Sequence, residues 1–280
     1  MKKHTWVVLL FLNFALHGIV FPQGFYYKAG AGYNTEWPNE IIAENSLTNY
    51  YLNGNSYSST EAESVEIKHG SYVNGMTLDG AVGYSWKTFG VEVGLSYLPE
   101  SSVESSVIIN DYTTTPSYMY KETGTNETSL FTVTPSFVLF TDIGLYGRAG
   151  VIFGIPFVNQ LYTIEDGWTN EVTQEKIDFR GNIAFGFSGG VGLAMGSDAI
   201  KFFIEADFNN LTWACSRSEI TKYTVNGVDE LPTMTTSQKV TNYVASYNTT
   251  SSNPNDPSTH LEAYMPLSAF GVKAGIAIGF

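Results

Sequence analysis

The sequence predicts an all-β protein, a transmembrane antiparallel up-and-down β-barrel of eight strands with long extracellular loops. Three observations lead to this prediction. The last ten residues, 271–280, alternate between apolar side chains and small or charged ones. Short and long connections alternate along the chain, and the N-terminus has the composition of a secretory signal. Lipid-facing and lumen-facing side chains alternate in the strands of a membrane barrel, which is the pattern seen here.

The N-terminus predicts a signal peptide. Lys2 and Lys3 precede an apolar stretch over residues 6–16, which is too short for a membrane-spanning helix of about 20 apolar residues. We expect residues 1–23 to be removed, with cleavage between positions 18 and 24. Residues 24–280 then form a single barrel domain.

Eight segments carry aliphatic or aromatic side chains at every second position and are the predicted strands. They are residues 25–33, 71–86, 89–98, 129–141, 144–155, 179–195, 200–213 and 263–280. Pro135 lies inside the fourth strand and weakens that prediction, because proline removes one hydrogen bond from the ladder.

The connections between these segments differ in length according to their order. Those after the second, fourth and sixth strands are short, whereas residues 34–70, 99–128, 156–178 and 214–262 are long and rich in Ser, Thr, Asn and acidic residues. Membrane barrels have short periplasmic turns and long extracellular loops. We therefore expect mobile, solvated loops outside the cell and both termini in the periplasm. Alternation within residues 157–177 also predicts a β-ribbon that extends the fifth and sixth strands.

Charged residues on the lumen face of these strands predict an internal network. The set comprises Lys28, Asp79, Glu92, Arg148, Arg180, Glu205, Asp207 and Lys273. An eight-stranded barrel has little internal space beyond that of its own side chains, and an isolated buried charge costs several kcal/mol, so these charges must pair. The pattern favours a salt-bridged plug, with a narrow gated ion path as the alternative. Lys201 shares the parity but lies beside a short turn, so we expect it at the wet periplasmic rim.

The C-terminal strand supports a resemblance to a known family. Its apolar face consists of Val272, Ala274, Ile276, Ile278 and Phe280. This pattern resembles the C-terminal assembly signal of bacterial outer-membrane barrels, in which a terminal Phe is read by the barrel assembly machinery. The strand pattern as a whole resembles the small OmpA/OmpX-like eight-stranded family. The resemblance implies an outer-membrane location, with outer-membrane lipid and the assembly machinery as partners.

Composition excludes several classes of function. The formal net charge is −13, and an acidic chain is a poor nucleic-acid binder. The single Cys215 cannot form a disulfide within the chain. We find no cluster with metal-ligand spacing and no phosphate-binding loop, and we expect no cofactor. His69 and Ser71 resemble the His-x-Ser dyad of outer-membrane lipid A deacylases, but both have lumen parity whereas that dyad faces lipid, and the motif lies too early in the chain.

The expected role is therefore non-enzymatic. The acidic loops predict a surface-exposed protein with a structural, adhesion or envelope-integrity function, whose partner is an extracellular ligand or a host surface. The first alternative is a small pore or transporter for ions or hydrophobic solutes. The second is a lipid A-modifying enzyme.

Overall fold

The computed structural model is almost entirely β-structure. It describes residues 23–36, 41–53, 56–69, 71–112, 117–197, 199–246, 253–262 and 264–279. The predicted signal peptide, apart from residue 23, and Phe280 lie outside the described residues. No helix in the described ranges is long and apolar enough to cross a membrane.

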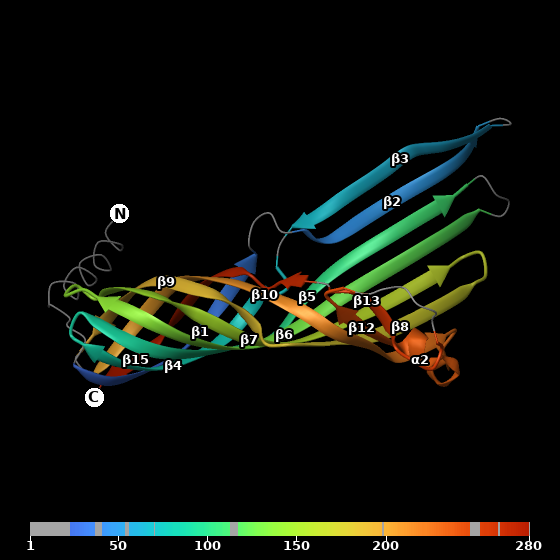
Figure 1. The fold of residues 1–280 in the computed structure, drawn as a ribbon. Helices are drawn as coiled ribbons and strands as arrows, with labels where there is room; N and C mark the ends of the chain where they lie inside the picture. The colour runs from blue at the N-terminus through green and yellow to red at the C-terminus, as the bar shows by residue number, and fades with distance from the viewer. Residues whose placement is uncertain are drawn as a thin grey trace, which may run out of the picture.

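Eight strands form a closed ring in which each strand pairs antiparallel with its two neighbours (Figure 1). In ring order they are β1 (Gly24–Glu36), β4 (Gly75–Trp86), β5 (Phe89–Asp111), β6 (Tyr118–Phe140), β7 (Leu145–Asp166), β9 (Ala184–Gly196), β10 (Ile200–Val225) and β15 (Ala269–Gly279). The last strand, β15, pairs with β1 and closes the ring. The predicted fold, an eight-stranded antiparallel barrel, is confirmed.

Short connections join the strands at one end of the barrel, which we call the turn end. Lys87 adopts a left-handed conformation with φ of 74°, and the carbonyl of Thr88 accepts a hydrogen bond of 2.7 Å from the Phe140 amide. Gly144, with φ of 83°, makes the next turn. The β1 strand begins at this end, since Gly24 lies opposite Ser85, and β15 ends there. The first and last barrel strands therefore meet beside the turns.

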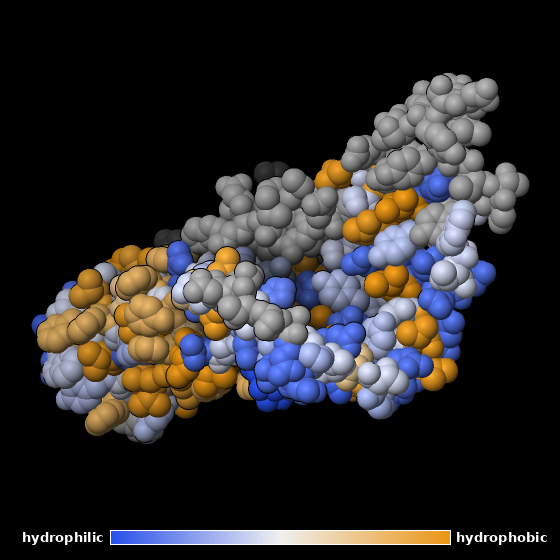
Figure 2. Space-filling view, turned by 45° about the vertical axis from the view of Figure 1, so that its right-hand side comes forward, coloured by the Kyte–Doolittle hydropathy of each residue, from blue (hydrophilic) through white to orange (hydrophobic). Residues whose placement is uncertain are grey.

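The outer face of the barrel is apolar. Figure 2 shows hydrophobic residues gathered over the barrel half of the molecule, and hydrophilic residues dominate the other half. Val272, Ala274 and Ile276 of the C-terminal strand are exposed on this outer face, and Ile278 is half-buried. Apolar side chains that face outward from a closed ring are what a lipid environment requires.

Pro135 interrupts the wall locally without opening the ring. Between β6 and β7 the residue pairs Val133–Phe153 and Ser136–Gly150 keep one register, and no pair is formed between them. On its other side Pro135 lies opposite Val93 of β5. The missing proline amide therefore affects two positions of one ladder only.

The prediction of mobile loops at the other end is wrong for most of their length. Strands β5, β6, β7 and β10 continue past the barrel, and they are joined by β2 (Ile41–Asn53), β3 (Ser56–His69), β8 (Glu171–Gly181), β12 (Val240–Val244) and β13 (Ser258–Leu261). Together these form one sheet in the order β3-β2-β5-β6-β7-β8-β10-β12-β13, which we call the sheet extension. Backbone pairing between neighbouring strands holds this sheet together beyond the barrel.

Smaller elements complete the sheet extension. They are β11 (Val228–Asp229), the 3-10 helix η1 (Leu231–Thr233), α2 (Thr236–Lys239) and β14 (Tyr264–Pro266). The predicted ribbon is present, because β7 runs to Asp166 and pairs with β8 from Glu171 onward. The predicted sixth strand is divided into β8 and β9, since residues 182 and 183 leave the ladder.

Candidate functional site: the closed lumen and the sheet extension

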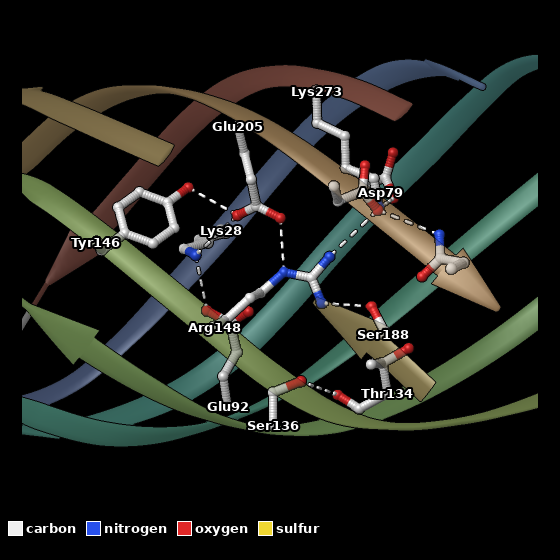
Figure 3. Close-up of polar contacts among 12 residues, drawn as sticks. Lys28, Asp79, Glu92, Thr134, Ser136, Tyr146, Arg148, Ser188, Glu205 and Lys273 are labelled. Atoms are coloured by element: carbon white, nitrogen blue, oxygen red, sulfur yellow. Dashed lines mark hydrogen bonds and ion pairs between the residues drawn. The ribbon is translucent and has the colours of Figure 1, made fainter. Parts of the chain in front are cut away.

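Seven of the eight predicted lumen charges meet at mid-height in the barrel. They form a chain of alternating sign in the order Glu92, Lys28, Glu205, Arg148, Asp207, Lys273, Asp79. Each lies on the inward parity of its strand, and six of the eight strands contribute (Figure 3). The side chains are 0–12% exposed. Because neighbours in the chain have opposite charge, their attraction offsets much of the cost of removing them from water.

The contacts along this chain are short. Lys28 Nζ lies 2.8 Å from a Glu92 oxygen and 3.8 Å from a Glu205 oxygen. Arg148 Nε lies 2.6 Å from Glu205, and its Nη2 lies 3.3 Å from Asp207. The Arg148 guanidinium uses a third nitrogen to donate to the Ser188 hydroxyl at 3.1 Å. The planar guanidinium of Arg148 therefore holds three partners in fixed directions, a geometry that the point charge of a lysine does not provide.

Lys273 of β15 makes the remaining links of the chain. Lys273 Nζ lies 3.2 Å from Asp207 Oδ2 and 2.8 Å from Asp79 Oδ1. Asp79 accepts a further hydrogen bond of 2.6 Å from the Thr77 hydroxyl. Both lysines thus bridge two carboxylates, and no charge in this set is isolated.

Two tyrosines complete the network, and neither was included in the predicted set. Tyr26 donates to Glu92 at 3.0 Å, and Tyr146 donates to Glu205 at 2.8 Å. Each ring lies across a glycine on the neighbouring strand, because Tyr26 is opposite Gly83 and Tyr146 is opposite Gly192. A Cβ atom at either glycine would collide with the tyrosine ring. Each tyrosine has lumen parity in the sequence, but its pairing with a glycine on the neighbouring strand becomes visible only when the register is known.

Apolar layers cover the charged layer on both sides. Toward the turn end the layer consists of Tyr26, Val138, Phe140, Tyr146, Ala194, Phe203 and Ala277. Toward the sheet extension it consists of Val73, Leu98, Leu130, Ile152, Val158, Ala184, Leu211, Trp213, Cys215, Leu267 and Ala269. An ion that crossed the lumen would have to lose its water in each apolar layer, which is unfavourable. The arrangement is that of a plug.

The cavities inside the barrel are small. One of about 50 Å³ borders the charged side chains, and another of about 20 Å³ lies beneath the apolar layer near the sheet extension. Such volumes hold a few water molecules. A hollow of about 1130 Å³ is open and is lined mainly by outward-facing side chains such as Phe187, Phe208 and Phe270. Glu92, Arg148, Ser188 and Asp207 also border it, from the inner side of the barrel wall.

Two lumen predictions are wrong. Arg180 is exposed on β8 and lies opposite Arg217 of β10. Along β7, Gly154 lies opposite Ala184 and Val158 lies opposite Phe179, so the segment that joins β8 to β9 holds one extra residue at its break. An extra residue in one strand inverts the parity of everything beyond it. Lys201, expected at a wet rim, is 2% exposed, because the apolar layer closes the turn end.

The structure offers little to nucleophilic chemistry. The Ser71 side chain is buried, and its hydroxyl accepts a hydrogen bond of 3.3 Å from the Val73 amide. The His69 side chain, its partner in the proposed dyad, lies outside the described residues. The thiol of Cys215 is buried and donates to the Arg217 carbonyl at 3.2 Å. Within the described ranges no group of three or more His, Cys, Asp or Glu side chains is arranged to hold a metal ion.

The sheet extension carries a second polar group, on the face that continues the lumen. Tyr162 of β7 lies opposite Glu175 of β8, and Gly124 of β6 lies beside Tyr162. Burial, together with Glu122 and Glu175, raises the pKa of the Tyr162 phenol. Burial also raises the pKa of Glu175 and of Tyr72. These groups are half-buried and remain accessible from one side of the sheet.

The closed ring, the apolar outer face and the filled lumen define a membrane-spanning β-barrel of eight strands. No protein-family model matches the chain, and no curated protein matches it in sequence. Among solved structures the chain is similar to the outer membrane protein OprG from Pseudomonas aeruginosa, at 11% identity and a TM-score of 0.42, over 92% of this chain and 96% of that one. The assignment of the fold rests on the paired strands described above and not on this likeness.

Proposed function

We propose that the chain is an outer-membrane surface protein. In this proposal the barrel is a closed anchor, and the sheet extension binds an extracellular ligand or a host surface. The turn end and both termini face the periplasm, outer-membrane lipid covers the apolar outer face, and the assembly machinery reads the C-terminal strand that ends in Phe280. The carrying observation is the three-layer lumen, since a barrel closed by two apolar layers and one charged layer has no aqueous path.

Support for a binding role comes from the inner face of the sheet extension. Tyr162 and Glu175 face the same side as Tyr72 and the lumen, where Glu122 accepts a hydrogen bond of 2.9 Å from Tyr120. Tyrosine rings give large contact area at low entropic cost and are enriched at interfaces. Carboxylates beside them suit hydroxyl-rich or basic partners.

The closed lumen is tested in planar bilayers. We expect the purified protein to give no conductance, or small and intermittent events, because ions would cross two dehydrated layers. The control is a large water-filled porin reconstituted from the same detergent, which conducts steadily. A large, steady, ion-selective conductance of this protein would overturn the plug and favour the pore alternative.

The binding role is tested by displaying the chain on a laboratory strain and measuring cell retention on arrays of immobilised glycans and basic peptides. We expect displaying cells to be retained severalfold above cells without the chain. Replacing Tyr162 and Glu175 by alanine should reduce retention to background. The matched control replaces Leu161 and Lys176, the adjacent cross-strand pair on the opposite face, by alanine. Equal retention with and without the chain on every surface would refute adhesion.

A further inference from the structure

The charged layer of the lumen contains one more acid than base. Its acids are Asp79, Glu92, Glu205 and Asp207, and its bases are Lys28, Arg148 and Lys273. The alternating chain therefore begins and ends on a carboxylate and carries a net charge of −1. Lys201, the next base along β10, lies beyond Phe203 in the apolar layer. A net charge enclosed between apolar layers is unfavourable unless a further cation or a proton balances it.

Three buried oxygen atoms at this chain accept no hydrogen bond from the described residues, and one of them, Asp79 Oδ1, still forms an ion pair of 2.8 Å with Lys273 Nζ. Asp207 Oδ2 is fully used, because it faces Arg148 and Lys273 and accepts a hydrogen bond of 3.2 Å from the Asn209 amide. Asp207 Oδ1 has no such partner, and neither has Asn34 Oδ1. The two residues are 3% and 7% exposed. Unsatisfied buried acceptors of this kind indicate a missing donor or a missing cation.

The strand register brings these two oxygens together over a glycine. Gly271 of β15 lies opposite Asn34 on one side and opposite Asp207 on the other. A Cβ atom at Gly271 would collide with Asp207 Oδ1 and would lie 2.8 Å from Asn34 Oδ1. The glycine therefore lets two acceptor oxygens, one of them a carboxylate oxygen, lie close to the backbone here, at the edge of a small cavity that Asn34 borders.

We propose that one alkali cation, Na⁺ or K⁺, binds here to Asp207 Oδ1 and Asn34 Oδ1. A single positive charge neutralises the layer, whereas a divalent ion would leave an excess of +1. Oxygen atoms are the ligands that hard cations prefer. Water completes the coordination from the adjoining cavity of about 20 Å³, which borders Asn34, Asn209 and Lys273. Rotating the Asn34 amide would let its nitrogen donate to Asp207 Oδ1, but the charge of −1 would remain.

The experiment measures thermal unfolding of the purified barrel in detergent micelles, by loss of the compact band in gels. Ionic strength is held constant while NaCl or KCl replaces choline chloride, because choline is too large for the site. We expect the unfolding temperature to rise with alkali concentration, as linkage requires for a cation bound only to the folded state. A larger rise in one of the two salts identifies the preferred ion.

Variants locate the site. Asn34→Ala removes one oxygen, and Asp207→Asn removes the excess charge, so each should abolish the difference between alkali and choline salts. Ser188→Ala is the matched control, because the Ser188 hydroxyl contacts Arg148 and neither proposed ligand, and it should keep the difference. Every readout is a difference between salts within one variant, so a general loss of stability does not imitate the result. Equal unfolding of the wild type in all three salts, with stability that rises as the pH falls, would assign the balance to a proton and overturn the proposal.

Discussion

Replacement of Arg148 by alanine should lower the free energy of unfolding by about 3–5 kcal/mol, because it leaves two buried carboxylates without their shared partner. The guanidinium contacts Glu205 at 2.6 Å and Asp207 at 3.3 Å, and it stands at the centre of the alternating chain. Without the guanidinium the chain divides into one group around Lys28 and another around Lys273. Urea unfolding of the protein in lipid or detergent, followed by gel mobility, measures the loss.

Two other arginines provide matched controls for this prediction. Arg180 is exposed, and Arg217 forms a half-exposed pair with Glu219 at 3.3 Å. Exposed pairs contribute about 0–1 kcal/mol, so both alanine variants should unfold close to the wild type. The double variant Arg148→Met with Asp207→Asn should lose less than the sum of its single variants, since it removes charge of both signs. A loss for Arg148→Ala no larger than for Arg180→Ala would contradict the buried network.

The eight strands could be predicted because their signal is local. Alternation within β4, β5 or β15 is visible in ten residues, and parity then assigns each charge to the lumen or to lipid. Which acid pairs with which base could not be predicted. The contact of Lys28 with Glu92, for example, depends on the register of β1 against β4 and of β4 against β5, which the sequence does not show.

Errors in the predicted site also have physical causes. One extra residue at the break between β8 and β9 reverses the parity of Arg180, and apolar alternation on either side of the break does not locate it. The burial of Lys201 depends on Phe203 of its own strand and on Tyr26 and Phe140 of two other strands, which together close the turn end. Alternation within residues 157–177 predicted the ribbon of β7 and β8, whereas the other strands of the sheet extension lack such an apolar stripe, so there the alternation ends before the hydrogen-bonded ladder does.

Replacement of Trp213 by alanine should lower the free energy of unfolding by about 3–5 kcal/mol, the usual loss for a large aromatic core side chain. Trp213 is 1% exposed in the apolar layer toward the sheet extension. Its Nε1 donates to the Asn182 carbonyl at 2.8 Å, and its ring fills the space over Gly181. The side chain thus seals the layer at the point where β8 gives way to β9, and its removal leaves both a cavity and an unpaired carbonyl.

Trp168 is the control for this variant, because it is 62% exposed in the turn between β7 and β8. Trp168→Ala should change stability by less than about 0.5 kcal/mol. The Trp213→Ala variant also shows whether a loss of stability is accompanied by opening of the lumen. Trp213→Ala opens only one of the three layers, so bilayers that contain this variant should still show no steady current. A steady current through a Trp213→Ala barrel that still folds would contradict this expectation. The charged layer and the apolar layer toward the turn end would then be insufficient to close the lumen, and Trp213 itself would close it.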